Sequence, residues 1–301
     1  MTIGTPTQAA LAAIFLAASS QLAMAQTQPA VLEIDVENLV EYIQNSNFWT
    51  AVRLGDITAV NGRPVRGTYV GVPVKLGLTP APEPGQALAD ITRVSFRQES
   101  FQILALDGLH VGSILILGTA GGPPPPRAPS AQENGDLAIV GGTGAFLGAR
   151  GEKGRGREIA PARRAAPNED PAHRRQIGGG HIREILYLIP FAAPLISKLA
   201  HASDFTAVST SKPARADEIL SLFATGLGPT RPANPVAVVN SPVEVTVNGM
   251  PAQIISVIGS PGTMDRYEVK FRLPPGTKKG AAAIELSAAW IASAPATIAV
   301  Q

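Results

Sequence analysis

Apolar and polar side chains alternate with a period of two along much of this chain. That period is typical of β-strands with one buried face and one wet face. Residues 89–106 show it over the longest stretch, and residues 243–247 and 267–273 repeat it near the C-terminus. The strand segments lie at hairpin spacing, and no long amphipathic helix separates them. The pattern therefore predicts an all-β protein.

Turn signals separate the predicted strands. Asn61-Gly62 is a typical two-residue hairpin turn, because both residues accept a positive φ, and it joins strands at 48–60 and 65–78. Residues 31–42 predict a further strand or a short helix. The 30 glycines and 27 prolines agree with short strands and many turns, two of them long proline-rich loops. Such a set of strands suits an antiparallel barrel or a sandwich.

Residues 136–152, DLAIVGGTGAFLGARGE, join a short apolar run to a glycine-rich turn. A dinucleotide-binding turn would need a helix to begin after its glycines. The sequence that follows, RGEKGRGRE, has no apolar stripe at helical spacing, and a Pro/Arg-rich stretch stands where the ribose-binding acid belongs. We therefore predict a strand, a tight glycine turn and a second strand, with Phe146 in the core.

The segment GGTGAFLGARG resembles the signature of dirigent proteins and their relatives in the allene oxide cyclase-like barrel superfamily. PVRGTYVGV at 64–72 and FQILALDGLHVGSILILG at 101–118 resemble strands that precede that signature, so the resemblance covers residues 33–158. It implies an antiparallel β-barrel of about eight strands over residues 31–190. Residues 182–190 would supply the last strand.

The C-terminal part has regular short strands and predicts an immunoglobulin-like β-sandwich without the usual cysteine pair, over residues 214–301 after a linker at 191–213. It resembles the IPT/TIG-like module of secreted bacterial proteins, through ATGLGPT, PVEVTVNGMPAQIISVIGSPG, YEVKFRLPPGTKKG and APATIAV. Such modules are usually structural or adhesive. The whole chain resembles exported bacterial proteins of uncharacterised function.

An apolar stretch at 9–18 followed by Ala23-Met24-Ala25 predicts a signal peptide over residues 1–25. We expect the mature protein to be secreted, periplasmic or on the cell surface. The apolar stretch is too short to cross a bilayer, and no other run of 18 apolar residues exists, so no membrane span is predicted. The absence of cysteine excludes disulfides and thiolate metal sites.

The most basic part of the chain lies near residues 151–181, with arginine pairs at 163–164 and 174–175. No aromatic residues are interleaved with these cations, whereas binding to single-stranded nucleic acid uses stacking side chains beside the charges. We interpret the segment as a solvated basic loop and predict no nucleic-acid partner.

Candidate chemistry is confined to the barrel. The four histidines lack the spacing of a metal site, and no cofactor motif is present, so we predict neither metal nor cofactor. Arg97 and Glu99 share one strand face and Tyr69 lies on a neighbouring strand. If that face is interior, these three are candidate catalytic residues that move a proton or orient a carbonyl. If it is exterior, Arg97 and Glu99 form a surface ion pair of little consequence, which is the simpler interpretation. Asp56 and Arg66 are candidate ligand-binding residues by the same argument.

Three functions fit these patterns. The first is a non-catalytic binding or surface-interaction protein whose barrel holds a small hydrophobic ligand. The second is a cofactor-independent cyclase or dirigent-type stereochemical guide acting inside the barrel. The third is a purely structural envelope component. The sequence assigns neither the ligand nor the oligomeric state.

Overall fold

The structure, a computed structural model, describes residues 29–45, 50–76, 94–121, 136–166, 168–189, 193–233, 235–263 and 265–301. The predicted signal peptide and most of both proline-rich loops lie outside the described residues. The described part is 64% strand and 3% helix, so the all-β prediction is confirmed. Among the described residues, no helix has the length and apolar character needed to cross a membrane.

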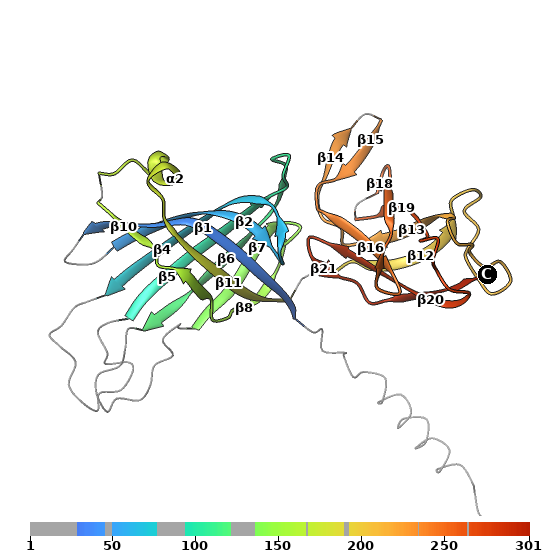
Figure 1. The fold of residues 1–301 in the computed structure, drawn as a ribbon, viewed down its shortest axis with the longest axis horizontal. Coiled ribbons are helices and arrows are strands. Elements are labelled where there is room, and N and C mark those ends of the chain that lie inside the picture. Colours follow the sequence, from blue (N-terminus) through green and yellow to red (C-terminus); the bar gives the residue numbers. More distant parts are fainter. Residues whose placement is uncertain are drawn as a thin grey trace, which may run out of the picture.

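The N-terminal part is a closed antiparallel barrel of eight strands. Its strands are β1 (Ala30–Asn45), β2 (Thr50–Val60), β4 (Arg66–Leu76), β5 (Val94–Leu104), β6 (His110–Gly121), β7 (Asp136–Gly144), β8 (Arg150–Lys153) and β11 (Gly180–Ile189). Going round the barrel, the order is β1, β11, β8, β7, β6, β5, β4 and β2, and the pairing of β2 with β1 closes it (Figure 1). The short strand β3 (Arg63–Pro64) extends the turn after β2.

The 16-residue strand β1 closes the barrel because it pairs with β11 on one edge and with β2 on the other. Its register shifts on both edges around Asn38, which has a positive φ of 49°. Such a bulge bends a strand and increases its twist, as barrel closure requires. The Asn61-Gly62 turn also has the two positive φ angles predicted for it, 50° and 72°.

The glycine-rich segment forms the predicted strand, turn and strand. β7 ends at Gly144, whose φ of 60° starts the turn, and β8 begins at Arg150. Phe146 points into the barrel core and is 1% exposed. No helix follows this turn, so the segment lacks the helix N-terminus that holds a dinucleotide pyrophosphate.

Residues 151–181 are mostly exposed or partly exposed, as predicted, but they form regular elements and not a loop. They include the end of β8, β9 (Arg157–Ala160), β10 (Arg163–Ala165), the short helix η2 (Pro171–His173) and α2 (Arg174–Ile177). β10 pairs in parallel with β1, and its Ala165 packs with Val40 and Tyr42 on the outer wall of the barrel. The segment covers these apolar side chains, which would otherwise face water, and their burial favours this arrangement.

The C-terminal part consists of two sheets that pack around one core, and we call it the sandwich. The first contains β12 (Leu195–His201), β13 (Ile219–Thr225), β19 (Tyr267–Arg272), β18 (Gln253–Gly259), β15 (Val236–Val239) and β14 (Thr230–Ala233), in that order. The second contains β17 (Met250–Pro251), β16 (Val243–Val247), β20 (Gly280–Ala288) and β21 (Ile291–Ala292), with β22 (Ala296–Val300) also on β20. Buried side chains of both sheets form one cluster, among them Leu222, Val269, Val245 and Ile284.

The prediction of a linker at 191–213 is wrong for residues 195–201, because β12 pairs with β13 and belongs to the first sheet.

The turn between β20 and β21 contacts the barrel. Ala289 and Ile291 are buried in the same cluster as the barrel core, and Trp290 packs against it. Figure 1 shows the barrel and the sandwich joined at this end.

Candidate functional site

The barrel interior has an apolar half next to the sandwich. Its side chains fill the space between strands, and most are fully buried. They include Leu32, Ile34, Ile57, Phe101, Ile103, Ile114, Leu186 and Leu188. Layers of this kind are how small barrels fill their interiors. This half is a structural core and offers no functional group.

Farther along the same strands, the interior becomes charged. Glu99 of β5 is 3% exposed, and Tyr69 of β4 is 2% exposed. Both lie on the face that carries Phe101, which belongs to the barrel core. The interpretation of this face as exterior is therefore wrong. The outward-facing neighbours on β5 are exposed instead, as Phe96 shows with 50% exposure.

Lys153, the last residue of β8, joins two carboxylates inside the barrel. Its Nζ donates to Glu99 Oε2 at 2.6 Å and to Glu184 Oε1 of β11 at 2.8 Å. The three side chains are only 8%, 3% and 4% exposed. Charge-assisted hydrogen bonds of this length are stronger than neutral ones. We name Glu99, Lys153 and Glu184 the interior ionic cluster.

The cluster changes the protonation behaviour of its members. Burial alone would lower the pKa of Lys153, but the attraction of Glu184 and Glu99 outweighs it, so the pKa is raised above its usual value. Burial raises the pKa of Glu184, and repulsion by Glu99 raises it further, against the attraction of Lys153. Two carboxylates thus share one ammonium, and Glu184 takes up a proton more readily than a carboxyl in water.

The Tyr69 hydroxyl borders the cluster. Its ring packs on Phe101 with centroids 5.0 Å apart, which fixes its direction. A Cβ built on Gly71 would lie 2.6 Å from the Tyr69 hydroxyl oxygen, so only glycine leaves this space. Burial raises the pKa of Tyr69 well above its usual value, and the charges of Glu99 and Glu184 raise it further. The hydroxyl therefore stays protonated, with its proton available for donation.

Three more charged side chains face the same interior. Arg53 of β2 pairs with Glu41 of β1 at 3.3 Å, and Glu41 is 4% exposed. Arg97 lies two residues before Glu99 on the same face. Among the described residues, Arg97 Nε and Arg53 Nε are buried and have no hydrogen-bond partner. Together with the interior ionic cluster, the described side chains named here make three acids and three bases, whose charges balance when all are ionised.

The other two candidates do not join this site. Asp56 faces the outside of the barrel wall, where it contacts Arg174 and accepts from Arg175 at 2.7 and 2.8 Å and from Asn38 at 3.0 Å. Burial raises the pKa of Asp56, but its bonds to Arg175, Asn38 and Arg174 more than offset this and leave the pKa lowered. Asp56 therefore anchors α2 to the barrel. Arg66 is exposed and also lies outside the interior.

Sequence reasoning missed Lys153 and Glu184. Lys153 lies in the stretch interpreted as a basic loop, and Glu184 lies in a strand chosen for its apolar residues. A signal for Glu184 was present, because it alternates with Leu186 and Leu188, both fully buried. No comparable pattern marks Lys153, because β8 has only four residues.

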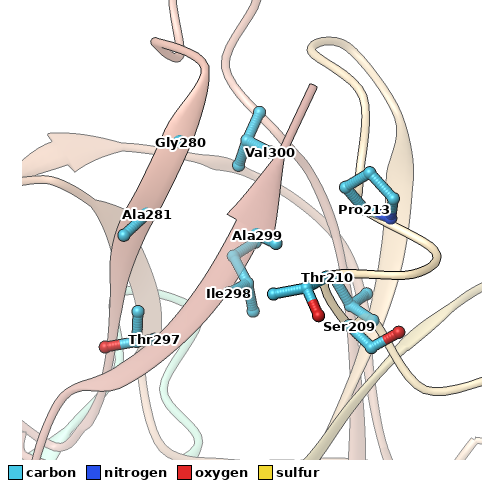
Figure 2. A pocket seen from close by; sticks show the side chains of 10 residues that line it. Ser209, Thr210, Pro213, Gly280, Ala281, Thr297, Ile298, Ala299 and Val300 are labelled. Atoms are coloured by element: carbon cyan, nitrogen blue, oxygen red, sulfur yellow. The ribbon is translucent and has the colours of Figure 1, made fainter.

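A separate hollow of about 550 Å³ lies on the sandwich, between β20, β22 and the loop before β13 (Figure 2). Its described lining residues carry hydroxyls at Ser209, Thr210 and Thr297 and are otherwise aliphatic or glycine. None of them is ionisable, in contrast to the barrel interior. Across the described ranges, no group of three or more histidine or acidic side chains is placed to hold a metal ion.

These features define an all-β protein with an ionic cluster inside a closed barrel. No protein-family model, curated protein or solved structure matches the chain.

Proposed function

We propose that the barrel is a non-catalytic binding site for a small molecule with an apolar body and a polar group. The observation that supports this most strongly is the interior ionic cluster, enclosed by a barrel whose other half is purely aliphatic and aromatic. Ligand sites are mostly apolar cavities with a few convergent polar groups, and this interior has that composition.

The free energy of burying charged groups also indicates that the interior ionic cluster has a role other than stabilising the fold. Replacing a buried ion pair by apolar side chains of similar volume is often neutral or stabilising. The aliphatic half of this barrel demonstrates that such filling suits the fold. A purely structural component would not need Glu99, Lys153 and Glu184 in its core. The cluster is explained better as a set of polar contacts for a guest.

The positions around the cluster suggest where the guest binds. Two interior-facing residues on the side away from the sandwich, Ala51 and Pro73, are small or conformationally rigid, and both are buried. Arg97 faces the same region with a buried Nε that has no partner among the described residues. A carbonyl or hydroxyl oxygen there would accept from Arg97 or from the Tyr69 hydroxyl, while the apolar body contacts the barrel wall.

A second candidate is a cofactor-independent cyclase or stereochemical guide. The raised pKa of Glu184 favours it, because a carboxyl that holds its proton more tightly than a carboxyl in water is better suited to general acid catalysis. Glu184 would donate the proton to an oxygen of the guest, and Tyr69 would orient that oxygen. We also propose that the barrel and the C-terminal part are related to the families that they resemble, and that the protein is exported from the cytoplasm.

Native mass spectrometry of the full chain, purified from its own host, tests the proposal. We expect an excess mass that is released on denaturation. Arg97→Leu and the double change Glu99→Gln with Glu184→Gln should lose it, while Glu285→Gln, an exposed acid on the sandwich, should keep it. A bare chain mass that persists after incubation with an apolar extract of the host would refute ligand binding. Turnover of the released compound, lost in Glu184→Gln alone, would favour the cyclase.

A further inference from the structure

The outer face of the first sandwich sheet carries an arrangement of aromatic and basic side chains that neither domain core requires. Phe205 is 47% exposed, and its ring centroid lies 6.2 Å from that of Phe223 on β13. Lys198 Nζ lies 5.8 Å from the Phe223 ring centroid, and Lys270 Nζ lies 5.8 Å from that of Phe205. We name Phe205, Phe223, Lys198 and Lys270 the aromatic-basic face.

Phe205 is held there at a conformational cost. Its φ is +56°, a region that bulky residues rarely adopt. Two hydrogen bonds maintain it: Phe205 N–H donates to His201 O at 2.9 Å, and Lys198 Nζ donates to Phe205 O at 2.9 Å. Strained residues persist where the surroundings enforce them, and they cluster at functional sites. Here the strain presents a large aromatic ring to solvent.

A hollow of about 520 Å³ adjoins this face. Phe223, Lys198 and Arg266 line it, together with hydroxyl side chains such as Ser197, Thr225 and Ser260. Among the described residues that line it there is no carboxylate, and no described acid forms an ion pair with Arg266. The hollow is therefore basic and rich in hydroxyls, and the Phe223 ring forms part of its wall.

We propose that this surface binds an acidic saccharide, a chain of sugars that carry carboxylates. The planar fork of Arg266 matches a carboxylate, and Lys198 adds a second charge beside it. The C–H face of a sugar ring packs on Phe205 and Phe223 through dispersion and burial of apolar area. The serine and threonine hydroxyls then exchange hydrogen bonds with sugar hydroxyls. This proposal is independent of the barrel.

The same chemistry argues against a stacked nucleobase. The two phenylalanine rings are tilted by 51°, so they offer no parallel slot. Glu268 lies opposite Phe223 on the same face, pairs with Lys270 at 3.6 Å and accepts from Ser221, so the charges available to an anion are those of Lys198 and Arg266.

The test is an NMR titration of the full chain with three probes: an oligogalacturonate, the neutral oligogalactose of equal length, and a short oligothymidylate. We expect the oligogalacturonate alone to shift amides around residues 197–205, 223–225 and 260–266. Arg266→Gln and Phe205→Gly should each weaken it about tenfold or more, which equals about 1.4 kcal/mol. Lys278→Gln, which removes an exposed lysine from another part of the sandwich, should leave binding unchanged.

Phe205→Gly separates binding from folding. Glycine adopts a positive φ without steric cost, so this variant relieves strain while it removes the ring. Its melting temperature should stay close to that of the parent chain. Equal binding of the neutral oligosaccharide, tighter binding of the oligonucleotide, an equal loss in Lys278→Gln, or no shifts at saccharide concentrations on the order of 10 mM would each overturn the proposal.

Discussion

Replacing Lys153 with methionine isolates the energetic role of the interior ionic cluster. Methionine has a similar length and volume but no charge, so the barrel keeps its packing while Glu99 and Glu184 lose their shared partner. Both carboxylates are nearly inaccessible to water, at 3% and 4% exposure. Removing one partner of a buried pair costs about 3–5 kcal/mol, because the remaining charge is left uncompensated.

For a unit of this size, about 1 kcal/mol corresponds to about 2–4 °C in melting temperature. We therefore expect Lys153→Met to melt about 6–20 °C lower at pH 7, as measured by far-ultraviolet circular dichroism. The loss should shrink in acid. The pKa of Glu184 is raised in the folded state, so protonated Glu184 stabilises the folded state. This stabilisation is fully present below about pH 4.3 and is lost as the pH rises through the folded-state pKa.

The triple variant Lys153→Met, Glu99→Gln, Glu184→Gln removes all three charges and leaves no ion unpaired. It should recover most of the stability and reach within about 1–2 kcal/mol of the parent chain. Lys278→Met, on an exposed lysine of the sandwich, should change stability by less than about 0.5 kcal/mol. A Lys153→Met variant within about 1 kcal/mol of the parent at pH 7 would refute the reasoning, because it would show that the cluster is hydrated or already neutral.

Three other predictions concern the barrel. Gly71→Ala should lower the free energy of unfolding, measured by urea denaturation, by about 1–3 kcal/mol, since the added methyl group meets the Tyr69 hydroxyl; an unchanged free energy of unfolding would contradict the position of that hydroxyl. Phe146→Ala should destabilise by about 3–5 kcal/mol in the same assay, because its ring is 1% exposed; a much smaller loss would show that the glycine turn does not depend on it. The folded pKa of Asp56 is lowered, so it stabilises the fold above about pH 3.9 and loses this effect as the pH falls through the folded value. Asp56→Asn should therefore make proteolysis near α2 faster at pH 7 and less dependent on acid, and equal cleavage of both proteins at pH 7 would contradict the anchoring role.

Much of the architecture could be predicted from local pattern. Alternation with a period of two identified the strand at 94–104 and those at 243–247 and 267–272. The Asn61-Gly62 turn and the turn before Phe146 followed from residues that accept a positive φ. These features are determined by neighbours in the sequence, so the sequence alone was enough. The interpretation of residues 151–181 as a loop was wrong, because the charges indicate only which side of the segment faces solvent. They do not indicate the barrel wall that the other side covers.

The sequence by itself determined which residues share a strand face, and therefore that Arg97 and Glu99 point the same way. Only the tertiary structure decided that this face is the interior. A period of two separates two faces, but barrel closure and its register determine which of them is enclosed. Closure also brings Lys153 to Glu99 and Glu184, which lie 54 and 31 residues away in the chain. Contacts at such separations depend on the pairing of whole strands, which no local pattern encodes.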